Sequence, residues 1–356
     1  MVHWRLMVVI GALIGLGSAP AAAQDPTFSQ IFASPTTLNP ALTGLFAGRY
    51  RAVINHRSQW AQVMETPFST TAFAADFHYR TDPKRRSSDA FGGGVVFLND
   101  RMAAAGLSSN QMLLGGAYHK HLDGRGIQQI SAGVQVGIAQ RSLGYGELTF
   151  EDEFDGSTTY LPGSGGEVLP ESSVSFGDYH FGINYSSNPQ RGAGLVAGLA
   201  VHHISQPEQS FYASETAGED IEVTNTLYAR YSGYLSLRLP LNRTIELLPR
   251  VYYLTQGPHA MALLGTHLRF EAPSNEQTAF QIGALLRLAQ EQSSYQGSSV
   301  IGFAGLEVGD FLFGFSYDAG VFGNGMGGSR NRSTFELSAS FIGLSDDDAA
   351  VPCPKF

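Results

Sequence analysis

The sequence predicts an all-β protein, and more narrowly a transmembrane antiparallel β-barrel of about fourteen strands. Three observations lead to this fold class. Charged residues make up only 15 % of the 356 residues, against roughly 25 % in an average soluble protein. The first residues have the pattern of an export signal. Stretches of about ten residues then alternate between apolar and small polar side chains, which is typical of barrel strands.

The composition excludes several classes of protein. The chain is 43 % hydrophobic, which is enough to bury a core and excludes a disordered protein. Its 42 glycines weaken helices and exclude a coiled coil. The net charge of -9, with no basic face, speaks against binding to nucleic acid. The low charge indicates that much of the surface does not face water.

The N-terminal residues 1–23 are expected to be a signal peptide. A short basic stretch ends at Arg5, the run 6–17 is apolar, and three alanines end at Ala23. This order matches a secretory signal and its cleavage site. The apolar run is too short for a transmembrane helix, which needs about 20 residues. An exported chain without helical spans can still enter a membrane as a closed barrel, which places this protein in a bacterial outer membrane.

The strands are predicted from alternation with a period of two. In 333–341, for example, Phe335 and Leu337 fall on one face, whereas Thr334 and Glu336 fall on the other. The same pattern recurs along the chain. The expected strands cover 49–59, 68–80, 89–99, 108–121, 127–141, 173–186, 192–204, 225–239, 243–255, 259–270, 277–289, 297–308, 310–321 and 331–342. Their even number is typical of single-chain bacterial barrels.

The two faces of these strands differ in a way that favours a barrel over a soluble sandwich. One face carries Leu, Val, Ala and aromatic residues and is expected to face lipid. The other carries Gly, Ser and Gln, as a confined polar lumen would, and glycine there allows close approach of other segments. The lumen also receives scattered charges, which either line a pore or pair as filler. They are Arg230, Arg238, Arg250, Glu246 and Arg287.

The chain is expected to have four parts. These are the signal peptide 1–23, an N-terminal segment 24–48, the barrel 49–342 and a C-terminal tail 343–356. The N-terminal segment either crosses the periplasmic rim or packs inside or under the barrel. An even strand count puts both ends of the barrel at one rim, so the segment and the tail are expected on the periplasmic side. The interruptions 142–171 and 205–224 are expected to be long loops.

No pattern in the sequence predicts a catalytic, cofactor or metal site. The acidic run 151–156 lacks the ligand spacing of a calcium loop. His202 and His203 are adjacent, so on a strand they would point to opposite faces and could not share a metal. There is no G-x-S-x-G elbow, and 323–328 is glycine-rich without the lysine of a phosphate loop. Cys353 is the lone cysteine, which excludes an internal disulfide. We expect no enzyme and no cofactor.

A series of motifs carries a family resemblance across the exported chain. They are Asp25-Pro-x-Phe28-Ser-Gln30, Asn39-Pro40-Ala-x-Thr-Gly44, Tyr50-Arg51, Arg57-Ser-Gln-Trp60, His203-Ile-Ser-Gln-Pro207, Phe313-Gly-Phe-Ser-Tyr-Asp318 and Cys353-Pro354-Lys-Phe356. In this order they resemble the PorP/SprF family of outer-membrane proteins of the type IX secretion and gliding-motility system. The resemblance implies a barrel of fourteen strands and a role in protein export.

The resemblance also implies partners. Such a protein would lie in outer-membrane lipid and dock the C-terminal sorting domains of secreted cargo or adhesins, components of the periplasmic or outer-membrane secretion machinery, or both. The positions expected to face partners are Asp25, Phe28, Asn39, Pro40, Gly44, Trp60, His203, Pro207, Cys353, Pro354 and Phe356. For Trp60 a place in the aromatic girdle of the membrane is an equal alternative.

A passive channel or hydrophobic-solute transporter is the alternative function. A docking protein is expected to have a plugged or narrow lumen and to copurify with specific proteins. A channel is expected to have a wet constriction ringed by charge and no protein partner. An outer-membrane enzyme is a third and weaker alternative, because nothing in the sequence pairs its Ser, His and Asp residues.

Overall fold

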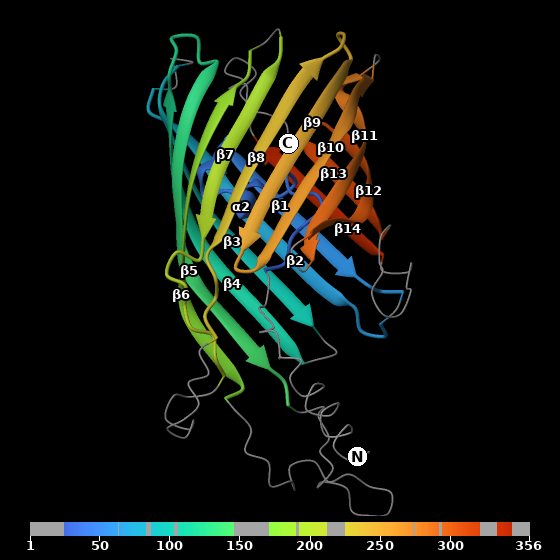
Figure 1. Ribbon diagram of the computed structural model, residues 1–356. Helices are drawn as coiled ribbons and strands as arrows, with labels where there is room; N and C mark the ends of the chain where they lie inside the picture. Colours follow the sequence, from blue (N-terminus) through green and yellow to red (C-terminus); the bar gives the residue numbers. More distant parts are fainter. Residues whose placement is uncertain are drawn as a thin grey trace, which may run out of the picture.

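The computed structural model describes residues 25–62, 64–82, 87–102, 106–145, 171–189, 192–211, 225–272, 275–291, 294–320 and 333–343. They form a closed barrel in which each strand pairs with its neighbours in the chain and the last strand returns to the first (Figure 1). The pairs at this closure are antiparallel and in continuous register, from Tyr50 opposite Gly343 to Gln59 opposite Thr334. The predicted all-β antiparallel barrel is confirmed.

The strands coincide closely with the predicted ones. They are β1 (Tyr50–Gln59), β2 (Phe68–Arg80), β3 (Ala90–Met102), β4 (Leu107–His121), β5 (Gln128–Leu143), β6 (Ser173–Ser187), β7 (Gly194–His202), β8 (Arg230–Pro240), β9 (Ile245–Gln256), β10 (His259–Ala272), β11 (Asn275–Glu291), β12 (Ser294–Val308), β13 (Phe311–Gly320) and β14 (Thr334–Gly343). The start of β8 differs most, because Thr226 instead bridges to Glu208 and Leu227 is buried.

The alternation of side chains places an apolar wall outside and a polar wall inside. On β5, Val136 and Ile138 are exposed on the outer face. Ser131 and Gln135, at inward positions of the same strand, are each 1 % exposed. On β13, Phe313 and its apolar partners face outward in the same way. The apolar outer face suits lipid, and the polar inner face suits an enclosed lumen. The predicted assignment of the two faces is confirmed.

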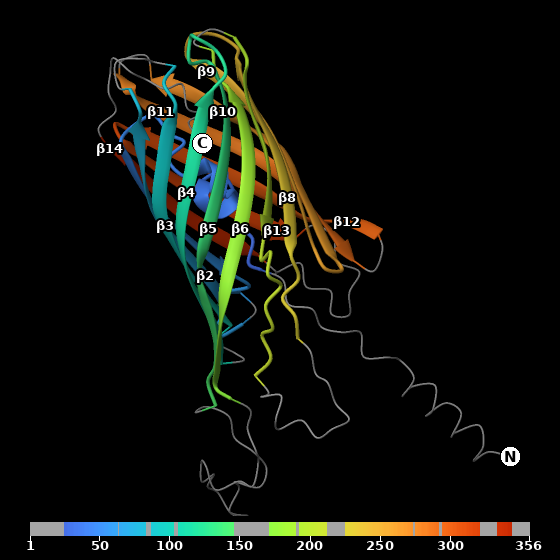
Figure 2. The same cartoon turned by 90° about the vertical axis from the view of Figure 1, so that its left-hand side faces the viewer.

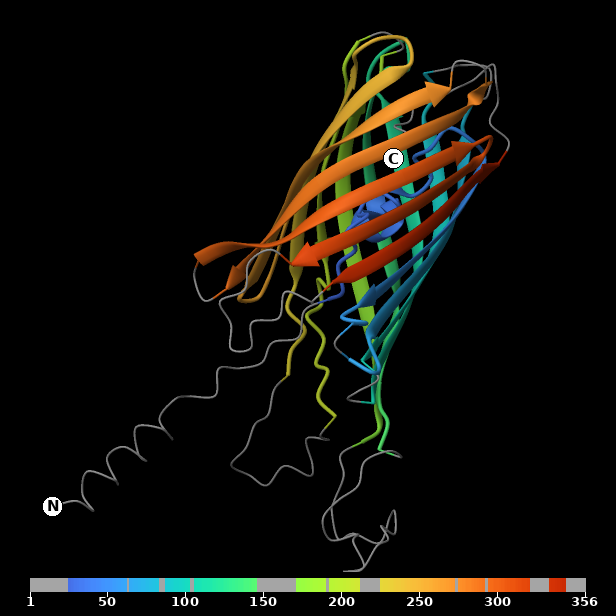
Figure 3. The same ribbon diagram turned by 90° about the vertical axis from the view of Figure 1, so that its right-hand side faces the viewer.

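The barrel has two unlike rims. The long-loop rim lies at the ends of β5, β7 and β13, and the long connections 144–172, 203–229 and 321–333 leave from it. The short-turn rim lies at the start of β1 and the end of β14, where connections such as 241–244 and 309–310 are tight. We use these two names below. The strands are strongly tilted between the rims (Figure 3).

Residues 25–48, which we call the plug, lie inside the barrel. Their two helical turns are α2 (Pro35–Leu38) and η1 (Pro40–Leu42). Both are visible in blue behind β4 and β5 in one view and behind β13 and β14 in the opposite one (Figures 2 and 3). Proline begins each turn, where its missing N–H is not needed. Among the described residues, no helix is long and apolar enough to cross a membrane.

Candidate functional site in the barrel lumen

The plug runs the whole length of the lumen. It starts at Asp25 beside Gln256, at the end of β9, and finishes beside Arg49, whose N–H donates to Gly343. Gln256 belongs to the long-loop rim and Gly343 to the short-turn rim. Of the two alternatives for this segment, the structure has the one in which it packs inside the barrel. Its first described residue, Asp25, lies at the rim opposite to the strand termini, because the segment crosses the lumen before the first strand begins.

The plug has few charged side chains and little secondary structure, so many of its backbone N–H and C=O groups need hydrogen-bond partners from the wall. Asp25 is the only charged residue in 25–48, and the few internal backbone hydrogen bonds of the segment all lie within 30–45. Buried N–H and C=O groups without partners would cost about 1–3 kcal/mol each. Four groups of contacts join the plug to the wall, and in three of them wall side chains bond backbone groups of the plug.

The first group surrounds Asp25 at the long-loop rim. Its carboxylate lies 2.6 Å from His203 Nε2, 3.4 Å from Arg230 and 3.1 Å from the donating amide of Gln256. Burial alone would raise the pKa of Asp25, but His203 and Arg230 outweigh it and hold that pKa well below its usual range. Burial alone would also lower the pKa of His203, but Asp25 and Asp178 raise it to about 9.

The second group is centred on Glu336 of β14, which is fully buried. Its carboxylate accepts the backbone N–H groups of Ser29 at 2.7 Å and Gln30 at 2.9 Å, and the amide of Asn55 at 3.0 Å. The side chain of Gln30 donates in turn to the backbone oxygen of Glu336. Arg57 nearby donates to the carbonyl of Thr27. One wall carboxylate thus accepts hydrogen bonds from two consecutive backbone N–H groups in an irregular segment of the plug.

The third group surrounds Asn39 at mid-height. Its Oδ1 accepts the N–H of Ala41 and begins η1, while Nδ2 donates to the carbonyls of Ile183 and Leu199 at 3.0 and 3.2 Å. These two carbonyls belong to neighbouring wall strands. The one asparagine therefore shapes the turn of the plug and joins it to the wall, and its side chain is fully buried.

The fourth group lies near the short-turn rim. Asp76 accepts the N–H of Gly44 at 2.7 Å and forms a buried pair with Arg51 at 2.6 Å. Arg51 also donates to the carbonyl of Leu42. His119 Nε2 lies 2.9 Å from the carbonyl of Thr43. Gly44 has φ +74°, a backbone conformation that favours glycine.

Glycines of the wall make room for the backbone of the plug. A Cβ at Gly92 would collide with the carbonyl of Thr43, and one at Gly133 would collide with that of Pro40. A Cβ at Gly182 would collide with Asn39. The predicted close approach of a segment to lumen glycines is confirmed at these three positions, which accounts for part of the high glycine content.

Apolar side chains fill the remaining space. One buried cluster joins Ile31, Phe32, Leu38, Leu42 and Leu45 of the plug to wall residues such as Tyr252, Leu263 and Ile301. The Arg250 guanidinium lies 4.6 Å from the centre of the Phe32 ring. Such packing excludes water from the middle of the lumen.

Four of the five scattered lumen charges form ion pairs, and the fifth, Arg250, lies over the Phe32 ring, which favours filler over the lining of a pore. Arg238 pairs with Glu246 at 3.0 Å, and Arg287 pairs with Asp318 at 3.0 Å. Arg230 faces Asp25. These arginines are filler that holds the wall and the plug together.

A pocket remains between the plug and the long-loop rim. Asp178, His180, His202, His203 and Arg230 are among its lining residues. The prediction that the side chains of His202 and His203 point to opposite faces is wrong, because both are buried inside the barrel. β7 ends at His202, and His203 has φ +56°, which turns its ring back into the lumen.

The residues expected to face partners have mixed positions. The plug residues Phe28, Asn39, Pro40 and Gly44, as well as His203, are buried against the chain's own barrel, and Asp25 is nearly so. Trp60 and Pro207 are half-buried at the long-loop rim, where Trp60 packs edge-on against Phe68. Cys353, Pro354 and Phe356 lie outside the described residues, as do the signal peptide, the acidic run 151–156 and the glycine-rich run 323–328. A role in partner binding stays a prediction.

Several important residues did not stand out in the sequence. Glu336, Asp76, Asp178 and His180 all contribute to the lumen contacts. Each one is a charged or titratable side chain at an inward position of a strand whose inward face also carries small residues such as Ser, Ala or Gly. That contrast is the signal that could have identified them.

Comparison with known proteins completes this picture. A family described as "Type IX secretion system membrane protein PorP/SprF" matches residues 21–341, which is most of the chain. The chain belongs to the PorP/SprF family. This PorP/SprF protein is accordingly an outer-membrane β-barrel of the type IX secretion system. No curated protein matches it.

Solved structures with a similar fold include three outer-membrane proteins. A Pseudomonas aeruginosa FadL homologue has 11 % identity and a TM-score of 0.49, covering 87 % of this chain and 94 % of that one. The Pseudomonas putida toluene transporter TodX has 10 % identity and a TM-score of 0.48, covering 90 % and 95 %. The Ralstonia pickettii toluene transporter TbuX has 11 % identity and a TM-score of 0.45, covering 86 % and 92 %.

Proposed function

We propose that this PorP/SprF protein is a docking component of the type IX secretion system. It binds the C-terminal sorting domains of secreted cargo, the periplasmic secretion machinery, or both. The observation that supports this over a passive channel is the plug. It occupies the lumen from rim to rim, and hydrogen bonds join it to the wall at four levels.

The plug also indicates where partners bind. Its motif residues are already committed to contacts inside the barrel, so a docked protein has to use the rims, the loops or the outer wall. Long loops of outer-membrane barrels face the cell exterior and short turns face the periplasm. The long-loop rim is then the side for exported cargo, and the short-turn rim is the side for periplasmic machinery.

The test is a pull-down of the tagged protein from outer membranes solubilised in mild detergent, followed by mass spectrometry. An unrelated outer-membrane barrel with the same tag is the control. We expect enrichment of secreted proteins that share a C-terminal sorting domain, or of a periplasmic secretion component. A barrel recovered alone under several growth conditions, together with steady conductance in planar bilayers, would instead support a channel or hydrophobic-solute transporter.

A further inference from the structure

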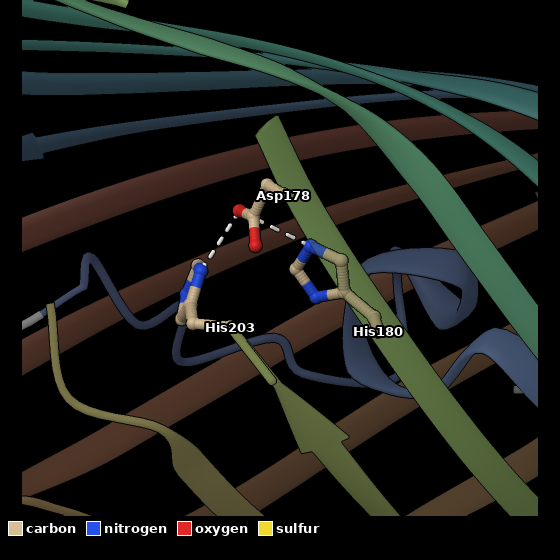
Figure 4. Close-up of side chains that lie close together, drawn as sticks. All are labelled: Asp178, His180 and His203. Carbon is tan, nitrogen blue, oxygen red and sulfur yellow. Dashed lines mark hydrogen bonds and ion pairs between the residues drawn. The ribbon is translucent and has the colours of Figure 1, made fainter. Parts of the chain in front are cut away.

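Three side chains from two strands meet at the edge of the long-loop pocket. Asp178 and His180 occupy alternate positions of β6, so both face the lumen. His203 follows β7 directly and turns toward them. Asp178 Oδ2 lies 2.8 Å from His203 Nδ1 and 3.2 Å from His180 Nε2, and the three atoms lie within 4.8 Å of one another (Figure 4).

These distances match the space around a small metal ion. A tetrahedral zinc ion with bonds of about 2.0–2.1 Å holds its ligand atoms about 3.3–3.4 Å apart. The two separations from Asp178, 2.8 and 3.2 Å, are slightly shorter than that value, and the ligand atoms all lie within 4.8 Å of one another, so the side chains would shift to admit an ion. Two imidazole nitrogens with one carboxylate are typical of zinc and related transition metals. Calcium and magnesium prefer oxygen ligands throughout.

The other nitrogen of each histidine already has an orienting partner. His203 Nε2 lies 2.6 Å from Asp25, and His180 Nδ1 lies 2.7 Å from His202 Nδ1. In the metal-bound form, with those nitrogens protonated, His203 Nδ1 and His180 Nε2 would present their lone pairs to the ion. Metal-bound histidines in proteins are oriented by just such neighbours.

A second observation points to a missing ligand. His180 is 4 % exposed, and the contact of its Nε2 among the described residues is the Asp178 carboxylate at 3.2 Å. A buried imidazole nitrogen held only by this long contact is available to bind an ion in the space between the two side chains. Asp178, His180 and His203 all line the pocket, which leaves room for a fourth ligand on the open side.

We propose that Asp178, His180 and His203 form a binding site for one divalent transition-metal ion of the zinc class. Because His203 also contacts Asp25, the bound ion would fix the first described residue of the plug to the wall. Binding at His203 Nδ1 would release the proton that this nitrogen shares with Asp178 in the metal-free barrel. This inference is independent of the docking role proposed above.

The experiment measures zinc bound to the purified full-length exported protein. The affinity tag must contain no histidine. After treatment with a chelator, the barrel in detergent is dialysed against buffered free zinc, and bound metal is determined by elemental mass spectrometry. Cobalt serves as a second probe, since its visible spectrum reports tetrahedral nitrogen and oxygen ligands. Each variant is checked for folding by its heat-dependent mobility on gels.

We expect one zinc ion per wild-type chain. H180A and the isosteric H180Q should weaken binding roughly 100-fold or more, and D25N, which removes only an orienting partner, should weaken it about 10–100-fold. H267A is the matched control, because His267 is a buried histidine of β10 that packs against Phe303, and it should bind zinc like the wild type. A wild-type protein that holds no more zinc than folded H180A and H180Q would overturn the proposal.

Discussion

Replacing Glu336 by Gln should release the plug, and the structure allows the size of the effect to be worked out. Glu336 accepts two plug amides at 2.7 and 2.9 Å. The Gln side chain keeps one oxygen that can accept one of these N–H groups. Its NH₂ group faces the other N–H, and two donors cannot form a hydrogen bond. Hydrogen bonds to charged groups contribute about 1.5–3 kcal/mol, so losing one and weakening the other should cost about 2–4 kcal/mol. The ratio of undocked to docked plug should then rise roughly 30- to 700-fold.

The assay is the rate at which a maleimide labels a cysteine in the plug. Ser34→Cys is the reporter, combined with C353S, because Ser34 is 1 % exposed and its hydroxyl makes no hydrogen bond within the described residues. Labelling then requires local opening, and its rate follows the undocked fraction. E246Q is the matched control, since Glu246 pairs with the wall arginines Arg238 and Arg269 and has no contact with the plug within the described residues. Equal labelling rates in E336Q and E246Q would refute this reasoning.

Three further predictions use the same logic. G133A should displace the plug at a cost of about 1–3 kcal/mol, because its Cβ would lie 2.7 Å from Ala41 N. The control G302A, whose Cβ has nothing within 4 Å, should leave the labelling rate of the Ser34→Cys reporter unchanged. Equal labelling rates in G133A and G302A would contradict the close approach of the plug to the wall. N39A should raise the labelling rate by an amount matching about 1–3 kcal/mol, since it leaves the buried N–H of Ala41 without its acceptor and removes two hydrogen bonds to wall carbonyls. An epitope inserted directly before Asp25 should bind antibody on intact cells, whereas an epitope in the turn 241–244 should bind antibody only after the outer membrane is permeabilised. Antibody binding to the turn 241–244, but not to the epitope before Asp25, on intact cells would contradict the path of the plug.

The sequence predicted the wall of the barrel well because the wall has a strict local rule. A residue on a strand faces lipid or lumen according to its parity, and a single error in register would expose every polar residue of that strand. A strand such as β5 can therefore be predicted from its own residues, without knowing which strands pair with it. The start of β8 is the informative exception, since its apolar residues continue into a loop that folds inward around Leu227.

The path of the plug could not be predicted in this way. It has no periodicity, and its contacts join residues far apart in the chain, such as Ser29 with Glu336 and Asn39 with Leu199. The same holds for the pocket, where the side chain of His203 is directed by one backbone angle. The prediction for His202 and His203 assumes that both lie on a strand, whereas the strand ends between them.

The contacts of the plug explain why the lumen face has its unusual composition. A segment with one charged residue cannot neutralise a ring of wall charges. Its backbone N–H and C=O groups can, however, form hydrogen bonds with single charged side chains of the wall. Carboxylates of Glu336 and Asp76 accept its N–H groups, and donors such as Arg51 and Gln135 reach its carbonyls. Glycines lie where its backbone comes nearest to the wall. A lumen that must conduct solutes needs none of this one-to-one pairing, since water would satisfy the wall. The wall is matched to one peptide segment of its own chain, and this match is the strongest physical reason to look for partners on the outside of the barrel.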